Sequence, residues 1–451
     1  MKEYLYNKEE LLSLAADRKY ALLRERLTHL TEVDTADFIN SLPAEQQMVV
    51  FSLTEKEVAA DVFAELPVES QESLVNSLND QQLTTIISDL AVDDMVDLVG
   101  DLPAVMVKRI LQHTKPETRE LVNKFLRFPE HSVGSIMTPQ FISLKKEMTV
   151  KDAIAKIKRL AANMETIYTV YVTDMQRHLE GIVGFKSLLL ADEDAMVSTL
   201  MERDVISIKT TDDQETASTL LNKYNFLSLP VVDAENCLVG IVTVDDAVDV
   251  MQDEATEDFQ KMAAIQPSEK PYLKTGVFEM TGHRILWLLG LMIADMFTGL
   301  ILGKYENAFV TIPLLVTFMP MITDTGGNAG SQSSTLIIRG MAIGEIQMRD
   351  WFKVFWKELR VSLMVGITLA AVDFVRIYFM LPNGNLNIAL TVSFAMIATV
   401  VLAKTIGGLL PVFAKLVHAD PALMAGPLIT TIVDAVSLII YFTIAKMLLH
   451  I

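Results

Sequence analysis

Long hydrophobic runs, interrupted by few charges, fill the C-terminal two-fifths of the chain. Five such tracts can be distinguished, at residues 284–303, 309–338, 358–380, 388–417 and 423–449. As helices, all five are long enough to cross a hydrocarbon core of roughly 30 Å. The pattern therefore predicts an all-α membrane domain of five transmembrane helices over residues 283–451.

A shorter period marks the N-terminal region, where apolar runs recur about every twelve residues between positions 25 and 125. Leucines close these runs: Leu42, Leu53, Leu66, Leu78, Leu90 and Leu102. Because one short helix cannot bury its own apolar face, stacking into an all-α superhelical solenoid over residues 1–130 is expected. An irregular helical bundle is the alternative.

Residues 131–252 contain an internal duplication. "YVTDMQRHLEGIVGFKSLL" is echoed by "PVVDAENCLVGIVTVDDAV", which aligns Asp174 with Asp233 and Gly181 with Gly240. Each copy predicts a strand, a helix, two strands joined by a turn, and a second helix. The duplication resembles a tandem pair of CBS domains, a resemblance that implies an α/β regulatory module with adenosine nucleotides, ATP among them, as candidate ligands.

Charge separates the chain into two parts. Residues 1–270 carry 26 basic and 47 acidic residues, whereas residues 271–451 carry 12 and 10. An acidic part followed by a near-neutral apolar part predicts a soluble domain joined to a membrane domain. The net charge of −19 argues against nucleic acid and favours cationic partners. The single cysteine, Cys237, excludes an internal disulfide.

Basic residues predict the orientation of the membrane domain. Under the positive-inside rule they mark the cytoplasmic connections, where most of them lie if the N-terminus is cytoplasmic. The charged N-terminus also lacks the apolar core of a signal peptide. A multi-pass protein with a cytoplasmic N-terminus and an external C-terminus is therefore expected.

The second tract contains a polar stretch, "MITDTGGNAGSQSSTLII" at 321–338. On a helix, Gly327, Ser331 and Thr335 form one row, with Asp324 and Asn328 alongside. Unsatisfied polar groups in hydrocarbon cost several kcal/mol each, so this row must face something other than lipid.

The fifth tract places Asp434 near its middle, with Thr430 one turn earlier. A mid-membrane carboxylate is a functional candidate, and we interpret Asp434 and the polar row as two walls of one pore. The alternative is a structural bond from Asp434 to a neighbouring hydroxyl or to Lys404. Carboxylate, hydroxyl, amide and carbonyl oxygens suit hard cations, Mg²⁺ above all, and not zinc or copper.

Two further carboxylates lie inside the hydrophobic tracts. Asp373 and Arg376 stand three residues apart, which favours an internal ion pair. For Asp295 a pore-lining role and a packing role are equally compatible with the sequence.

An acidic run, "DDAVDVMQDEATED" at 245–258, has seven carboxylates in fourteen residues and no basic residue. Asp246, Asp249 and Asp253 share a helical face. A solvated acidic helix is the commoner outcome for such a run. Its place between the duplicated module and the first tract favours an acidic connecting or plug helix over 253–282 that senses cations.

The stretches "DTGGNAGSQSSTLIIRG" and "DPALMAGPLITTIVDAVSLIIYF", behind a CBS pair and a helical N-terminal domain, resemble the MgtE family of bacterial magnesium channels. The resemblance implies a homodimer embedded in the lipid of the bacterial plasma membrane. Its pore would lie on the two-fold axis and hold hydrated Mg²⁺. The pore residues that it implies are Asp434, Thr430, Gly327, Asn328, Ser331 and Thr335. The cytosolic sensor residues that it implies are Asp246, Asp249, Glu254, Glu257, Asp258, Asp213, Glu215, Asp61, Asp93 and Asp97.

These observations predict a Mg²⁺-selective channel that imports Mg²⁺ and is closed by cytosolic Mg²⁺ bound between its acidic domains. A secondary carrier for another cation or solute, regulated by nucleotide at the CBS pair, is the alternative. An enzyme is disfavoured because the chain contains no HExxH or GxSxG motif.

Overall fold

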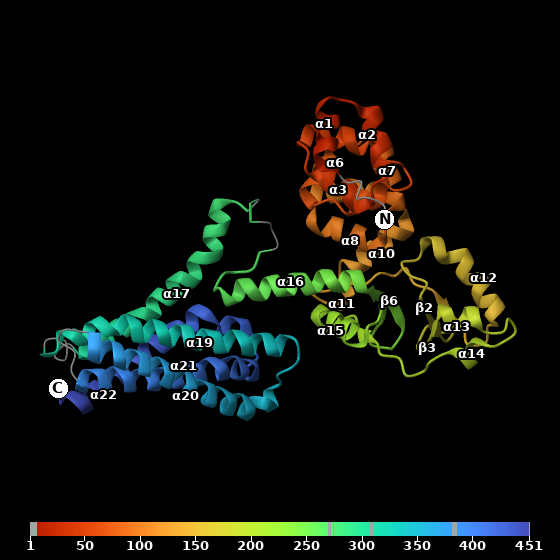
Figure 1. Ribbon diagram of the computed structural model, residues 1–451. Helices are drawn as coiled ribbons and strands as arrows, with labels where there is room; N and C mark the ends of the chain where they lie inside the picture. Colours follow the sequence, from red (N-terminus) through yellow and green to blue (C-terminus); the bar gives the residue numbers. More distant parts are fainter. Residues whose placement is uncertain (1–6, 269–271, 274, 306–310, 381–385, 451) are drawn as a thin grey trace. The chain divides into compact units, whose positions relative to one another are not determined.

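The computed structural model describes residues 7–268, 272–273, 275–305, 311–380 and 386–450 (Figure 1). The chain divides into two compact units, Met1–Val250 and Met251–Ile451. The division falls within helix α16 (Val244–Met262). Each unit has its own buried hydrophobic core, and each is described separately below.

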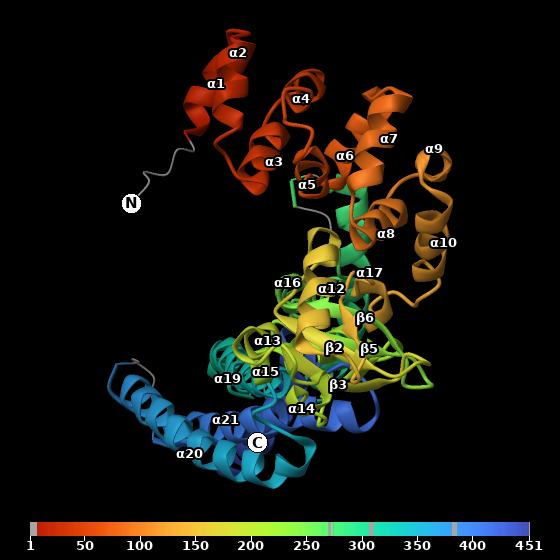
Figure 2. The same ribbon diagram turned by 90° about the vertical axis from the view of Figure 1, so that its right-hand side faces the viewer.

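The first unit begins with ten short helices (Figure 2). They are α1 (Lys8–Ala16), α2 (Tyr20–Leu27), α3 (Glu32–Asn40), α4 (Ala44–Phe51), α5 (Ala59–Ala64), α6 (Val68–Ser77), α7 (Asp80–Asp89), α8 (Val92–Asp101), α9 (Ala104–His113) and α10 (Pro116–Phe125). Several contact the helix two places further along: α3 with α5, α4 with α6, α5 with α7, α7 with α9, and α8 with α10. This packing is that of a helical solenoid.

The recurring leucines explain the stacking. Five of them are buried in the core of the first unit, and Leu53 packs against that core from a partly buried position. Prolines at positions 43, 67 and 103 stand directly before α4, α6 and α9 with φ near −57°. Because proline fixes φ and lacks an N–H, it ends one helix and permits the next to begin.

The duplicated region forms two three-stranded sheets of identical topology. The first repeat contains α11 (Val133–Ile136), β1 (Ser143–Leu144), α12 (Val150–Leu160), β2 (Thr169–Thr173), β3 (Leu179–Gly184) and α13 (Phe185–Leu190). The second contains α14 (Val197–Leu200), β4 (Ile208–Lys209), α15 (Gln214–Tyr224), β5 (Ser228–Val232), β6 (Leu238–Thr243) and α16. In both sheets the first pairing is parallel and the second antiparallel, so the predicted duplication is confirmed.

The glycines matched between the repeats permit close backbone approaches. A Cβ at Gly181 would lie 2.8 Å from the Glu202 carbonyl oxygen, and one at Gly240 would lie 3.0 Å from the Thr138 carbonyl oxygen. In both cases the β3 or β6 strand runs directly against backbone, where only glycine fits without a shift.

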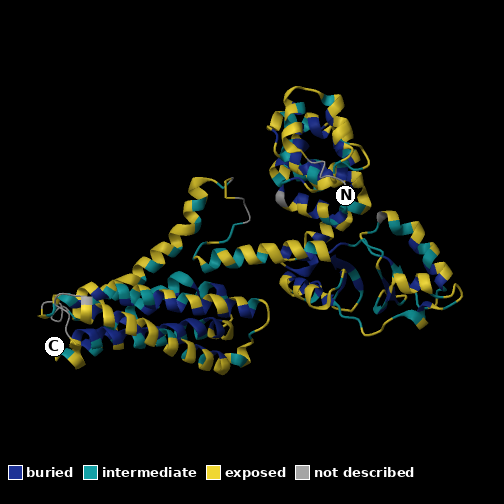
Figure 3. Ribbon diagram, viewed as in Figure 1, coloured by how far each residue is buried: buried dark blue, intermediate teal, exposed yellow. Residues whose placement is uncertain are grey.

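The second unit is helical. It contains α17 (Val277–Lys304), a 3₁₀ turn at Pro313–Phe318, α19 (Met319–Ala342), α20 (Trp351–Val375), a π-helical turn at Arg376–Met380, α21 (Leu386–Leu416), a 3₁₀ turn at Pro421–Met424 and α22 (Gly426–Leu449). Helix α21 packs against α19, α20 and α22, while α17 contacts α22. No residue of α17 is buried within the chain (Figure 3).

Four segments are long and apolar enough to cross a membrane: Val277–Lys304, Met348–Phe379, Leu386–Leu416 and Pro421–Leu449. The fifth predicted tract, residues 309–338, does not qualify as one apolar span among the described residues. Pro313 begins a 3₁₀ turn before α19, Pro320 lies in the first turn of α19, and α19 itself carries the polar row. The polar residues that make this tract a candidate ion path also lower its hydropathy, so it does not count as an apolar membrane span.

Glycines bring α19 and α21 into backbone contact. A Cβ at Gly407 would lie 2.2 Å from the Gly330 carbonyl oxygen, a distance that no side chain tolerates. One turn away, a Cβ at Gly326 would lie 2.7 Å from Cγ2 of Thr399, also on α21. Small residues at such crossings let membrane helices approach closely.

Candidate functional site

The polar row of α19 meets the fifth predicted span at Gly327. A Cβ there would lie 2.9 Å from Cγ2 of Thr430, so α22 lies directly against the glycine. The Thr430 hydroxyl donates to the Gly426 carbonyl oxygen at 3.0 Å. Two of the predicted pore residues, about 100 positions apart in the chain, are therefore neighbours.

Asp434 lies one turn beyond Thr430 and is half-buried. Its Oδ1 is inaccessible to solvent and accepts no hydrogen bond from the residues that the structure describes. The carboxylates of Asp295 on α17 and Asp324 on α19 are close enough to repel it. A buried carboxylate oxygen without a donor is costly, and the two neighbouring carboxylates add negative potential at Asp434, which favours a cation beside it.

Lys404 does not serve as the partner of Asp434. Its Nζ lies 3.5 Å from Oε1 of Gln332 and 3.4 Å from Oγ of Ser333. Ser333 in turn donates to the buried carboxylate of Glu358 at 2.6 Å. The lysine thus belongs to a separate buried polar network between α19, α20 and α21.

The two other carboxylates predicted inside the membrane, Asp373 and Asp295, have different surroundings. Asp373 and Arg376 approach to 3.2 Å, which confirms the predicted ion pair. Asp295 interacts electrostatically with Asp434, an observation that favours its pore-lining role over a packing role.

Much of the polar face of α19 remains uncovered within one chain. Asp324, Asn328 and Thr335 are exposed and Ser331 is half-buried, whereas Gly327 is buried. Asn328 Nδ2 donates to Asp324 Oδ2 at 3.2 Å, which orients both side chains along the same exposed edge. Within one chain, this polar edge of α19 is therefore left exposed by the described residues.

In the first unit, carboxylates from three distant segments form what we call the α8 cluster. Its members are Asp93, Asp94 and Asp97 of α8, Glu165 before β2, and Asp245 and Asp246 at the start of α16. Partial desolvation and mutual repulsion raise the pKa of Asp94 and of Glu165 to about 7. The same causes raise the pKa of Asp246 to about 6, although the Thr243 hydroxyl donates to it at 2.7 Å.

A second group, the α5 cluster, surrounds Asp61. Its members are Glu32, Asp37, Asp61, Glu65, Asp89 and Asp249. Partial desolvation and the neighbouring carboxylates raise the pKa of both Asp61 and Glu65, and Asp249 is the largest charge acting on Glu65. Asp246 and Asp249, one turn apart on α16, thus face one cluster each.

Not every predicted sensor residue joins a cluster. Asp213 is the N-cap of α15, where its Oδ1 accepts from the Glu215 backbone N–H at 2.8 Å. Glu215 follows in the first turn of that helix. A sensor role for these two residues stays a prediction.

The remaining predicted sensor residues, Glu254, Glu257 and Asp258, belong to the second unit near the end of α16. Lys261 Nζ lies 2.6 Å from Oε1 of Glu257 and 2.8 Å from Oδ2 of Asp420, just before α22. Partial desolvation and the charge of Asp420 raise the pKa of Asp258. The lysine therefore joins α16 to the loop that leads into the helix bearing Asp434.

Sequence reasoning missed several of these charged groups. Asp94 lies in the stretch "DDMVD" at 93–97, between the predicted sensor residues Asp93 and Asp97, so its proximity to both follows from the sequence. No sequence motif identifies Glu165 as a candidate, because only the tertiary fold brings it close to the carboxylates of the α8 cluster. Asp420 lay inside a recognised motif, but its pairing with Lys261 depends on tertiary contact.

Because the pKa values of these carboxyls are raised, we expect folding stability to fall, and Mg²⁺ binding to strengthen, as pH rises. Between about pH 4 and 7 the folded carboxyls bind more protons than unfolded ones, so their unfavourable effect on folding grows as pH rises. Bound Mg²⁺ offsets the repulsion only where the groups are ionised. We expect Mg²⁺ to raise the Tm of the full chain more at about pH 7.5 than at about pH 5.5.

Thermal unfolding of the detergent-solubilised chain, with and without Mg²⁺, measures this difference. Asp246→Asn should reduce the Mg²⁺-induced shift at the higher pH. An equal shift at both pH values would contradict Mg²⁺ binding by these clusters.

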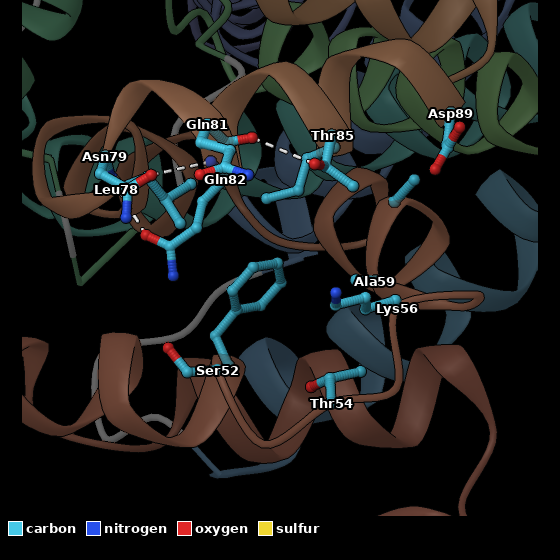
Figure 4. Close-up of a pocket in the computed structure, with 13 residues that line it drawn as sticks. Ser52, Thr54, Lys56, Ala59, Leu78, Asn79, Gln81, Gln82, Thr85 and Asp89 are labelled. Carbon is cyan, nitrogen blue, oxygen red and sulfur yellow. Dashed lines mark hydrogen bonds between the residues drawn. The ribbon is translucent and has the colours of Figure 1, made fainter.

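A pocket of about 240 Å³ lies between α4, α5 and α7 in the solenoid (Figure 4). Polar side chains on its rim are already engaged in local structure. Asn79 Oδ1 accepts from the Gln82 N–H at 2.9 Å, and Gln82 Oε1 accepts from the Asn79 N–H at 3.2 Å. These bonds form a capping box at the start of α7, so the two side chains have a structural role here.

Comparison with known proteins covers almost the whole chain. Residues 319–444 match a family model described as a divalent cation transporter, MgtE. Residues 30–131 match the MgtE intracellular N domain, and residues 133–194 and 197–253 match the CBS domain. All three parts of the chain thus find a family counterpart.

Full-length relatives agree with these matches. The magnesium transporter MgtE of Thermus thermophilus is 34% identical over 95% of each chain. That of Bacillus subtilis is 29% identical over 98% of this chain and 97% of the relative. The solved cytosolic domain of the Mg²⁺ channel MgtE in complex with ATP aligns over 54% of this chain and 100% of its own, with 33% identity and a TM-score of 0.51.

Proposed function

This chain belongs to the MgtE family of magnesium transporters, and from that premise we propose that it is a Mg²⁺-selective channel closed by cytosolic Mg²⁺. It is a transporter and not an enzyme. Import into the cytoplasm and negative feedback by the imported ion are the parts that we add to the family assignment.

The orphaned Oδ1 of Asp434 is the observation that carries the pore proposal. Thr430 and Gly327 place α22 against the polar row, and the carboxylates of Asp295 and Asp324 converge on the same region. Because the exposed edge of α19 is open on its other side, we propose that a second copy of the chain closes the path. The pore is then the two-fold interface of a homodimer.

The chemistry of this path fits a hydrated Mg²⁺. Carboxylate oxygens carry the charge, and Asn328, Ser331 and Thr335 offer amide and hydroxyl oxygens without sulfur or imidazole. Mg²⁺ sheds its water reluctantly. Such walls accept hydrogen bonds from the water shell, so the ion need not be stripped before it passes.

The two acidic clusters support the gating proposal. Asp246 and Asp249 of α16 face the α8 and α5 clusters, in which unneutralised carboxylates repel one another. When cytosolic Mg²⁺ is high, bridging ions hold α16 against the solenoid; when it falls, repulsion releases the helix. The ion shifts the equilibrium because it binds the compact state more tightly.

Helix α16 also provides the route from sensor to pore. Its far end bears Glu254, Glu257 and Asp258, and Lys261 connects it to Asp420 ahead of α22. We propose that ordering of α16 by Mg²⁺ is transmitted through this junction to α22 and therefore to Asp434.

Several finer assignments accompany this proposal. The domains are a solenoid over 1–130, a CBS pair over 131–252, an acidic connecting segment over 253–282 and a five-helix pore domain over 283–451. The sequence predicts the connecting segment as one helix, but it comprises the end of α16 up to Met262 and the start of α17 from Val277. The N-terminus lies in the cytoplasm and the C-terminus outside. Because a relative's cytosolic domain was solved with ATP, we propose ATP as a ligand of the CBS pair here too.

Flux into proteoliposomes tests the proposed function. With the purified chain reconstituted, Mg²⁺ entry should follow its electrochemical gradient and fall as Mg²⁺ on the cytoplasmic face is raised. Uptake that requires a counter-transported ion would instead establish a secondary carrier. Entry that is insensitive to Mg²⁺ on the cytoplasmic face would contradict the feedback.

A further inference from the structure

The two hairpin turns of the CBS repeats lie side by side and present metal-binding side chains. Asp174 begins the turn between β2 and β3, and Asp233 begins the turn between β5 and β6. Oδ1 of Asp174 accepts from the His178 N–H at 2.9 Å, while Oδ1 of Asp233 accepts from the Cys237 N–H at 2.8 Å. His178 and Cys237 therefore occupy equivalent positions in the two repeats.

The backbone pairs these two residues directly. Leu179 N–H donates to the Asn236 carbonyl at 3.2 Å, and Leu238 N–H donates to the Arg177 carbonyl at 2.9 Å. These bonds flank an antiparallel bridge between His178 and Cys237. Such a non-hydrogen-bonded pair brings its two side chains close together on one face, with Cα atoms about 4.5 Å apart.

Two acidic side chains complete the group around the thiol. Sγ of Cys237 and a carboxylate oxygen from each of Asp233 and Glu235 lie within 4.8 Å of one another. The thiol donates only a long bond, 3.5 Å, to the Gln176 carbonyl. The three side chains come from positions i, i+2 and i+4 of one turn, so their spacing is set by that turn.

His178 is already oriented as metal-binding histidines are. Its Nδ1 bonds Oδ2 of Asp174 at 2.8 Å, and among the described residues nothing bonds its Nε2. A carboxylate on one ring nitrogen fixes the tautomer and leaves the other nitrogen as a ligand. The carboxylates of Asp233 and Glu235 also act electrostatically on His178, so the imidazole stands beside that group, although its ring nitrogens lie outside the 4.8 Å set.

We propose that Cys237, His178, Asp233 and Glu235 form a binding site for a divalent transition metal, with Zn²⁺ as the test ion. The ion joins the turns of the two CBS repeats. Asp174 is a positioning residue that acts through His178. Binding releases the thiol proton to water, because the thiolate is the ligand, and replaces waters of the ion.

The donor set distinguishes this site from the magnesium sites. Thiolate and imidazole favour Zn²⁺ and related ions, whereas Mg²⁺ takes oxygen ligands. Tetrahedral Zn²⁺ needs ligand atoms about 3.5 Å apart. The ligand atoms of Asp233, Glu235 and Cys237 must therefore close by about 1 Å, and the His178 imidazole must move further to join them. Arg177 also acts on Cys237 electrostatically, but its guanidinium is bonded to the Leu238 carbonyl at 3.2 Å.

Alkylation of the single cysteine gives a direct test on the full-length, detergent-solubilised chain. After chelation, Zn²⁺ in excess Mg²⁺ should slow iodoacetamide labelling of Cys237 at least tenfold, as read by mass spectrometry, whereas Mg²⁺ alone should not. His178→Ala keeps the thiol and should abolish the protection. Asp174→Asn should weaken Zn²⁺ affinity about tenfold or more.

Metal content after desalting provides the second measurement. The wild-type chain should retain about one Zn²⁺ per chain, and Cys237→Ser and His178→Ala should each retain far less. His29→Ala, an exposed histidine of the solenoid, is the matched control and should retain the wild-type amount. Wild-type labelling that Zn²⁺ does not slow, or equal protection in His178→Ala, would overturn the proposal.

Discussion

Asp434→Ala should reduce Mg²⁺ uptake at least a hundredfold while the chain still folds and inserts. The substitution removes the proposed pore carboxylate whose buried oxygen has no donor among the described residues. In the proposed homodimer, this carboxylate is lost from both copies. A hundredfold loss corresponds to about 2.7 kcal/mol of ion stabilisation, a modest demand on a desolvated charge. Folding should not suffer, because the substitution also relieves repulsion from Asp295 and Asp324.

Uptake in cells that lack other Mg²⁺ importers, together with flux into proteoliposomes, measures the effect. Asp434→Asn separates charge from shape and should be nearly as inactive as the alanine variant. Asp373→Asn is the matched control, because this intramembrane carboxylate is paired with Arg376 and should be dispensable for flux. Normal uptake by Asp434→Ala would refute the pore assignment.

Joint replacement of Asp246 and Asp249 by asparagine should leave the channel open at Mg²⁺ concentrations that close the wild type. Asp246 belongs to the α8 cluster together with Asp245, and Asp249 is the residue of α16 in the α5 cluster. Without them the α5 cluster has no carboxylate from α16, and the α8 cluster keeps only Asp245 from that helix, so an ion bridges α16 to the solenoid more weakly. The Mg²⁺ concentration for half-closure should rise at least tenfold, within the usual range of a coupling free energy between sites.

Mg²⁺ currents or fluxes at increasing Mg²⁺ on the cytoplasmic face give the half-closure value. Asp192→Asn combined with Asp194→Asn removes the same charge from an exposed loop after α13 and serves as the control. Open-state flux should be unchanged in both double variants. Wild-type closure in the Asp246 and Asp249 variant would leave the sensor assignment without support.

Pattern alone predicted much of the architecture, for reasons that are local. The duplication in 131–252 repeats turn residues and glycines whose positions follow from close backbone contacts, such as that of Gly240 with Thr138. The leucine period of the solenoid reflects burial of one face per short helix. The pairing of Asp373 with Arg376 lay within a single helical turn.

Contacts between distant segments were beyond such reasoning. Glu165 joins the α8 cluster through the fold of the first CBS repeat, and its surrounding sequence is unremarkable. Lys261 and Asp420 are separated by about 160 residues, so their ion pair has no local signature. The proximity of Asp295 to Asp434 likewise depends on how α17 packs against α22.

The contact between Gly330 and Gly407 constrains how such a channel can open. With no side chain between the two backbones, α19 and α21 can neither slide past each other nor tilt without collision. We therefore expect any gating movement to carry α19 and α21 together as one rigid unit. Helix α22 packs as closely, because a Cβ at Gly330 would also lie 2.7 Å from Cγ2 of Ile429. In the proposed channel we therefore expect the displacement to occur at α17, which has no residue buried within the chain, and not by deformation of the polar helix.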